Sequence, residues 1–324
     1  MTSEQAPPWR SPFSRFTGNC RIVWRRLWRA PKPRLDWPRL TGVVAAALVL
    51  IVVEGLLLDA AVARRSQALP EPMTGVFQFL TQFGRSDWWL IPSGLIMLVV
   101  AFGDWRRPVR AVAAAWAEIG AYAGTFFVAI ALPGIVADVI KPLVGRVRPG
   151  VAVESDVAFA PFTLGYAYHS FPSGHANTMA ALAVAAVATF GARALPIVLA
   201  TMVVAMSRVV IGVHYLSDVV AGILLGGALA WLVVRTAAGA GFGFTVRPSG
   251  ANAPRLDAAR RVLARPGGTR RALAGLGMAL TWRGPSAAGR DPIERRGEVG
   301  DEVVRVLQPG EQADQRTLRA PRGG

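Results

Sequence analysis

The chain has 324 residues, of which 52% are hydrophobic and only 17% are charged. Soluble domains contain about 25% charged residues, and the apolar residues here gather in long blocks between Thr41 and Val234. This distribution excludes an ordinary soluble protein and predicts an all-α, polytopic membrane protein. The lone Cys20 and three histidines exclude an internal disulfide and a Cys-rich zinc site.

The formal net charge is +16, from 36 Lys and Arg against 20 Asp and Glu. Such a balance is typical of proteins that bind nucleic acid or anionic lipid. Most arginines lie beside apolar segments: in the first 40 residues, in Asp104–Arg110 and beyond Val234. This placement favours cytoplasmic flanks of membrane helices, so we expect contact with membrane lipids and no nucleic-acid partner.

Residues 1–40 contain Pro, Trp and many Arg but no early apolar core, which predicts a basic cytoplasmic arm and not a cleavable signal peptide. Residues 41–235 then predict a membrane domain of about six transmembrane helices, because each needs roughly 20 residues to cross. The six candidate segments are Thr41–Ala63, Trp88–Gly103, Ala111–Val139, His175–Phe190, Leu195–Val213 and Tyr215–Val234. Glu54 and Asp59 in the first segment should face the bundle or the far interface.

The basic arm predicts a cytoplasmic N-terminus, which leaves the polar connection Lys141–Gly174 and the link around His214 outside. The predominance of Arg over Lys suggests a bacterial source, so we expect an inner (plasma) membrane protein with these segments facing the periplasm or exterior. Residues 236–324 are rich in Gly, Pro, Ala and Arg, which predicts a mostly disordered, basic cytoplasmic tail. An alternative for Arg255–Trp282 is a basic amphipathic helix on the inner leaflet, interrupted by Pro266, Gly267 and Gly268.

Three polar clusters occur at the predicted outer ends of helices. In the first, Lys141 and Arg148 lie seven residues apart and would share a helical face, where two cations suit a phosphate. The alternative is a pair of interfacial side chains that extend toward lipid headgroups.

The second cluster is Pro172-Ser173-Gly174-His175, directly before an apolar helix. The Ser173 hydroxyl, nearby backbone N–H groups and the positive helix end point to one spot, where anions bind readily. Gly174 allows a close approach of the backbone. Ser173 could alternatively serve only as the N-cap of the helix.

The third cluster comprises Ser207-Arg208, His214 and Asp218. On a helix, His214 and Asp218 would share a face, so the carboxylate could accept the Nδ1–H and leave Nε2 free as a nucleophile. The alternative is a His–Asp contact that only ties two helices together.

Taken together, the clusters resemble the phosphatidic acid phosphatase type 2 superfamily, which includes lipid phosphate phosphatases, undecaprenyl-pyrophosphate phosphatases and vanadium-dependent haloperoxidases. The resemblance covers residues 111–234. Its signature is Lys, six residues, Arg-Pro; then Pro-Ser-Gly-His; then Ser-Arg, five residues, His, three residues, Asp. The matching residues are Lys141, Arg148, Pro149, Pro172, Ser173, Gly174, His175, Ser207, Arg208, His214 and Asp218. His169 lies outside the signature and is expected to be a loop residue.

The resemblance implies a phosphatase in which His214, oriented by Asp218, forms a phosphohistidine and His175 protonates the leaving oxygen. Lys141, Arg148, Arg208, Ser173 and the Gly174 N–H would hold the phosphate, with no metal or other cofactor required. A lipid phosphate or diphosphate is the expected substrate, in the order polyprenyl diphosphate, phosphatidate, phosphatidylglycerol phosphate. Two alternatives remain: a lipid-linked phosphotransferase using the same intermediate, and a non-catalytic lipid-phosphate binding or transport protein.

Overall fold

The computed structural model describes residues 12–30, 36–151 and 158–281. The chain divides into two compact units, which are described separately. The first comprises Met1–Val23, Leu98–Gly120 and Leu256–Gly324, and the second comprises Trp24–Met97 and Ala121–Arg255.

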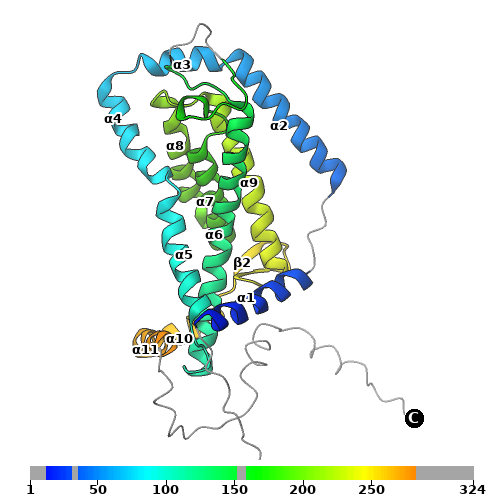
Figure 1. Ribbon diagram of the computed structural model, residues 1–324, viewed down its shortest axis with the longest axis vertical. Helices are drawn as coiled ribbons and strands as arrows, with labels where there is room; N and C mark the ends of the chain where they lie inside the picture. The colour runs from blue at the N-terminus through cyan, green and yellow to red at the C-terminus, as the bar shows by residue number, and fades with distance from the viewer. Residues whose placement is uncertain (1–11, 31–35, 152–157, 282–324) are drawn as a thin grey trace, which may run out of the picture. The chain divides into compact units, whose positions relative to one another are not determined.

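Helices make up nearly all the regular structure of the described residues (Figure 1), which confirms the predicted all-α class. The α-helices of the described residues are α1 (Pro12–Arg29), α2 (Trp37–Leu57), α3 (Asp59–Gln67), α4 (Glu71–Leu80), α5 (Asp87–Phe102), α6 (Arg110–Val144), α7 (Gly174–Phe190), α8 (Leu195–Val210), α9 (Leu216–Gly239), α10 (Asp257–Leu263) and α11 (Gly268–Leu280). Three 3₁₀ turns, η1 (Thr81–Gly84), η2 (Tyr166–Tyr168) and η3 (Gly191–Ala194), and two paired antiparallel strands, β1 (Phe244–Val246) and β2 (Asn252–Pro254), complete the described elements.

Five stretches are long and apolar enough to cross a membrane, judged by length and composition. They are Trp37–Leu57, Glu71–Phe102, Arg110–Val144, Gly174–Val210 and Leu216–Gly239. The fourth stretch contains α7 and α8, which pack against each other on either side of η3 and so form a helical hairpin. Counting that hairpin as two crossings, the described chain agrees with the prediction of about six membrane helices.

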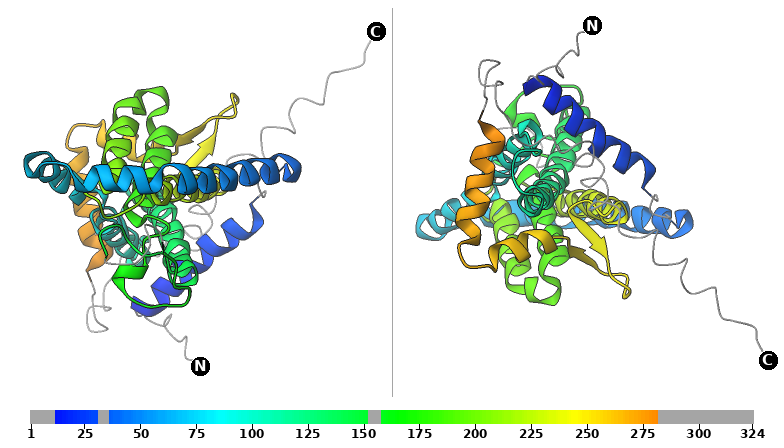
Figure 2. Two further views of the ribbon diagram at one scale, coloured as in Figure 1. Left: turned by 90° about the horizontal axis from the view of Figure 1, so that it is seen from above. Right: turned by 90° about the horizontal axis from the view of Figure 1, so that it is seen from below.

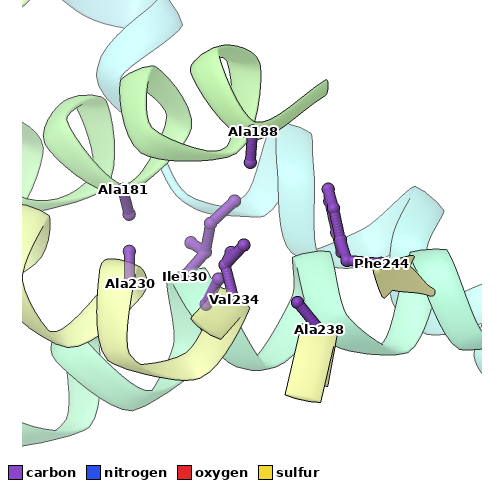
Figure 3. Packing of buried hydrophobic residues seen from close by; sticks show 8 residues of the cluster. Ile130, Ala181, Ala188, Ala230, Val234, Ala238 and Phe244 are labelled. Carbon is purple, nitrogen blue, oxygen red and sulfur yellow. The ribbon is translucent and has the colours of Figure 1, made fainter. Parts of the chain in front are cut away.

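Helices α7 and α9 pack closely in the second unit because α9 has glycine where the two helices meet. A Cβ atom at Gly222 would lie 2.5 Å from the Ser173 carbonyl oxygen, and one at Gly226 would lie closer still to Asn177. Below this contact, small and branched side chains from α6, α7 and α9 meet Phe244 of β1 in a buried core (Figure 3). This packing fixes the N-terminal end of α7 against that of α9.

The first membrane helix ends earlier than the sequence predicts. Helix α2 ends at Leu57, and a separate helix α3 begins at Asp59 and runs across the end of the α7–α9 bundle (Figure 1; Figure 2, left). The predicted segment Thr41–Ala63 therefore extends six residues beyond the C-terminal end of α2. Asp59 is fully buried at this end, because its carboxylate has a cationic partner described below.

The first unit contains regular structure where composition predicted a mostly disordered tail. Val262 and Ala259 of α10 pack against Val112 and Ala115 of α6, in a small buried cluster. Glu118 of α6 accepts hydrogen bonds from the N–H groups of Ala258 and Ala259, at 2.7 and 3.1 Å, and so caps α10. The close packing of small alanines and this cap explain why α10 forms a helix at this place.

Two helices, α10 and α11, lie within Arg255–Trp282, whereas the position of this segment on the inner leaflet stays a prediction. The break between them falls at residues 264–267, where Pro266 and Gly267 had been expected to interrupt a single helix. Residues 282–324 of the predicted tail, and residues 1–11 of the predicted arm, lie outside the described residues. The boundaries 1–40, 41–235 and 236–324 stay a prediction.

Candidate active site

The His–Asp pair sits where the α8–α9 link meets the start of α9. His214 lies in the link and Asp218 in the first turn of α9. The two residues therefore do not share a helix, contrary to the prediction from their spacing. They still meet: His214 Nδ1 is 3.5 Å from Asp218 Oδ2. The Asp218 carboxylate also accepts a hydrogen bond from the Tyr215 N–H at 3.0 Å. Tyr215 is the N-cap residue and Asp218 the third residue of α9, so this contact is part of a capping box.

Arg148 determines which nitrogen of His214 is unprotonated. Arg148 Nη1 lies 3.0 Å from His214 Nε2, and a guanidinium can only donate. Nε2 must therefore accept with its lone pair, and in the neutral ring the proton is on Nδ1, facing Asp218. This is the tautomer that a nucleophilic Nε2 requires.

Burial lowers the pKa of His214 to about 4; the hydrogen bond from its ring to Asp218 raises the pKa, while the nearby Arg148 lowers it further. The imidazole is therefore neutral at physiological pH. A neutral ring keeps the Nε2 lone pair available.

Lys141 and Arg148 reach the same place by a route different from the predicted helical face. Helix α6 ends at Val144, and Gly145 has φ of +59°, a left-handed conformation common directly after a helix. Arg148 therefore lies in the following loop. Lys141, in the last turn of α6, forms an ion pair with Asp138 at 2.6 Å, and its Nζ lies 3.4 Å from the position that a Cβ atom on Gly174 would occupy.

Ser173 is the N-cap residue directly before α7, but its hydroxyl makes no capping hydrogen bond to the helix. The side chain is fully buried, and Oγ has no hydrogen-bond partner within the described part of the chain. The Ser173 N–H donates to the Asp218 backbone oxygen at 3.0 Å, so the two clusters are directly joined. A buried, unsatisfied hydroxyl costs free energy, which is evidence against the capping-only alternative.

Arg208 and His175 complete the cluster. The Arg208 backbone oxygen accepts from the His214 N–H at 3.2 Å, and Arg208 Nη1 donates to Thr81 Oγ1 of η1 at 3.0 Å. A Cβ atom at Gly84 of η1 would lie 2.8 Å from the ring of His175, so η1 packs directly on that imidazole. His175 interacts electrostatically with four basic groups: Lys141, Arg148, Arg208 and His214. The structure thus brings all eight predicted site residues to one end of the second unit.

A buried ion-pair network behind Asp218 was missed in the sequence. Arg146 donates from Nη1 to Asp218 Oδ1 at 2.5 Å and from Nη2 to Asp59 Oδ2 at 2.6 Å. The Ser217 hydroxyl donates a hydrogen bond to Asp59 Oδ2 and accepts one from Arg146 Nη1. Ser170 donates its hydroxyl to Asp218 Oδ2. The only sequence signals were an acid in an apolar segment and an additional Arg between Lys141 and Arg148.

The arginines of the site differ in their partners. Burial lowers the pKa of Arg146, but Asp218 and Asp59 more than compensate and hold it above its ordinary value. Burial lowers the pKa of Arg148, whose guanidinium donates to the backbone oxygens of Tyr166, Val213 and His169. Among the described residues, the ion pairs include Arg146 but neither Arg148 nor Arg208. Two buried guanidinium groups without a carboxylate, beside a neutral imidazole, have the charge and the free donors that an anion would need.

An all-α membrane fold with a His–Asp pair beside two buried arginines fits the class of membrane enzymes that act on phosphate esters. The sequence model of the PAP2 superfamily matches residues 122–241. The lipid A 1-phosphatase of Rhizobium johnstonii is 31% identical over 234 residues, which cover 69% of this chain and 92% of that protein. The lipid A 1-phosphatase of Rhizobium etli is 30% identical over 224 residues, covering 67% and 92% respectively.

A more distant relative is the decaprenylphosphoryl-5-phosphoribose phosphatase of Mycolicibacterium smegmatis, 35% identical over 47% of this chain and 72% of that protein. Among solved structures, the transmembrane PAP2-type phosphatidylglycerolphosphate phosphatase from Bacillus subtilis is similar, with a TM-score of 0.41 and 22% identity over 60% of this chain and 92% of that one. The chain belongs to the PAP2 superfamily. It is an integral membrane phosphatase of that superfamily.

Proposed function

We propose that the protein hydrolyses the phosphomonoester or diphosphate of a lipid through a phosphohistidine on His214. The observation that supports this most directly is the contact of Arg148 with His214 Nε2, which specifies a neutral ring with its lone pair facing a cationic site. An incoming phosphate would take the place of the imidazole as the acceptor of that guanidinium. Nε2 would then be free to attack phosphorus.

The chemistry divides between the two histidines. Nε2 of His214 forms a bond to phosphorus as the bond to the leaving oxygen breaks, and His175 gives that oxygen a proton. Asp218 stabilises the charged His214 ring, and Arg148, Arg208, Lys141 and the Ser173 hydroxyl bind the equatorial oxygens. His175 then removes a proton from water, which attacks the phosphohistidine and releases phosphate.

The substrate class we favour is a lipid phosphate in which the phosphate is attached to a sugar, either of a glycolipid or of a polyprenyl-linked sugar. Two relatives, each covered to 92% by this chain, are named lipid A 1-phosphatases, and a third acts on a polyprenyl-linked sugar phosphate by its name. The test is a panel of lipid A, polyprenyl diphosphate, phosphatidate and phosphatidylglycerol phosphate, ranked by kcat/KM in detergent. Binding without phosphate release on every member would contradict the proposal, and transfer to an added alcohol in place of water would favour a phosphotransferase.

Activity is expected to survive removal of divalent metals. The described residues contain no group of three or more His, Cys, Asp and Glu side chains that could hold a metal ion, whereas the cations of the site are side chains. Phosphate release should therefore be equal in EDTA and in magnesium, and vanadate should inhibit as a mimic of the five-coordinate transition state. Loss of activity in EDTA that magnesium restores would contradict this expectation.

We further propose that the site faces the periplasm or exterior of a bacterial inner membrane. Gln67 of α3 is exposed at the site end of the second unit, and Ala251 is exposed in the β1–β2 link of the same unit. In a Cys20→Ser background, a membrane-impermeant thiol reagent on intact spheroplasts should label Gln67→Cys and not Ala251→Cys. The reverse pattern would refute the orientation.

A further inference from the structure

The loop between α6 and α7 exposes a run of large apolar side chains at the end of the bundle that holds the candidate site. Phe159, Phe162, Leu164 and Tyr166 are 58%, 77%, 80% and 69% exposed. Large apolar side chains exposed close together in the chain favour a surface that contacts a partner, a ligand or a membrane.

The loop is held firmly against the end of α6. The Phe162 N–H donates to the Pro142 oxygen at 2.7 Å, and the Ala160 N–H donates to the Gly145 oxygen at 2.8 Å. A side chain at Gly145 would collide with the backbone of Ala160, so glycine is required for this approach. The exposed side chains are therefore presented by an ordered backbone.

The exposed loop continues the apolar surface of a membrane helix. Ile135, Val139 and Leu143 of α6 follow one another at four-residue spacing and are all exposed, so they form one stripe along the helix. Leu143 directly follows Pro142, the residue to which Phe162 is bonded. Because α6 is long and apolar enough to cross a membrane, this stripe is suited to face hydrocarbon, and the exposed loop side chains follow it at the end of the helix.

The exposed part of the loop also contacts Arg148, which lies earlier in the same loop. The Tyr166 backbone oxygen accepts from Arg148 Nε at 2.9 Å, and the guanidinium carbon lies 3.9 Å from the centre of the Tyr166 ring. Arg148 in turn contacts His214. This loop thus combines exposed apolar side chains with contacts to an arginine of the proposed phosphate site.

We propose that Phe159, Phe162, Leu164 and Tyr166 form a substrate-docking surface that binds the hydrocarbon chain of the lipid phosphate as the phosphate reaches Arg148. This inference rests on the proposed function and adds to it the surface that recognises the lipid tail. It separates two parts of recognition: the arginines bind the phosphate of any ester, and the loop favours esters carried by a long chain.

The test compares Phe162→Ser/Leu164→Ser with a control pair, Phe190→Ser/Leu195→Ser. The control residues are 55% and 60% exposed and flank η3 between α7 and α8, away from the candidate site. The substrates are dioleoyl phosphatidate in phosphatidylcholine vesicles and water-soluble p-nitrophenyl phosphate. We expect the loop pair to lower kcat/KM for the vesicle substrate about tenfold or more through KM, because two large apolar contacts are lost.

The same loop variant should hydrolyse p-nitrophenyl phosphate at the wild-type rate, and the control pair should leave both rates unchanged. Equal losses on both substrates, or the same loss in both variants, would overturn the docking surface. Failure of the wild-type protein to hydrolyse either substrate would instead count against the proposed function.

A second measurement does not depend on turnover. Leu164→Cys in the Cys20→Ser background, labelled with bimane and reconstituted in vesicles, should be quenched by brominated acyl chains and protected from aqueous iodide. Adding a long-chain phosphonate analogue should change the acyl-chain quenching, whereas inorganic phosphate should not. Quenching by iodide alone, or no response to the analogue, would overturn the proposal.

Discussion

Replacing His214 with alanine should reduce turnover of every substrate by at least about 10⁴-fold, because the group that bonds to phosphorus is gone. His175→Ala should behave differently. It should cost about 10²–10⁴-fold with an alkyl phosphate, whose leaving oxygen needs a proton. With p-nitrophenyl phosphate, whose leaving group departs as a stable anion, the loss in kcat/KM should be much smaller, because kcat/KM does not include the later hydrolysis of the phosphohistidine.

The measurement is kcat/KM for both variants on both substrates, with folding checked by thermal unfolding in detergent. With p-nitrophenyl phosphate as substrate, an alkaline detergent quench, in which the P–N bond of phosphohistidine survives, should show a phosphorylated protein in the wild type and in His175→Ala, and none in His214→Ala. Equal losses for the two variants on both substrates would contradict the division of roles, even if both variants remain folded.

Arg146→Met should strongly destabilise the protein, by about 3–5 kcal/mol in the free energy of unfolding, because it leaves buried carboxylates without their cation. Arg146 is 4% exposed and bonds to both Asp59 and Asp218, which are fully buried. Arg146→Lys should recover only part of this loss, since an ammonium cannot reproduce two directed contacts from one planar group.

Arg208→Met is the matched control for Arg146→Met. Arg208 is also buried, but it donates to Thr81 and its Nε has no partner within the described residues. Removing it should cost at most about 1 kcal/mol of stability, while activity falls because the phosphate loses a cation. Thermal unfolding and kcat/KM measured side by side test the contrast: similar melting temperatures for the two variants would mean that the network behind Asp218 does not hold the fold.

The sequence located the parts of the site that lie within short segments and missed the parts that join distant ones. Lys141, Ser173, His175, His214 and their neighbours could be found because each cluster is local and follows a recognisable spacing. Asp59 is 87 positions from Arg146, and no local pattern pairs residues so far apart. The roles of the site residues stay a prediction, although their proximity is a property of the structure.

The errors in the fold have a similar origin. Apolar content continues past Leu57, so hydropathy alone extended the first membrane helix to Ala63, whereas the burial of Asp59 against Arg146 requires a new helix direction. The ordered α10 depends on a cap from Glu118, which is 140 positions from Ala258. Composition describes a segment by itself and cannot register such a partner.

The two glycines of α9 have a consequence for how the site tolerates change. Because Gly222 and Gly226 bring α9 against the backbone of α7, the distance between the Ser173 N–H and the Asp218 oxygen depends on side chains that are absent. A single added methyl group at Gly222 would press on the Ser173 backbone oxygen and push α7 away from α9. It would do so without replacing any side chain that is proposed to bind phosphate. The spacing of the Ser173 and Asp218 backbones is therefore determined one to two helical turns from Asp218, by glycines that have no side-chain chemistry of their own.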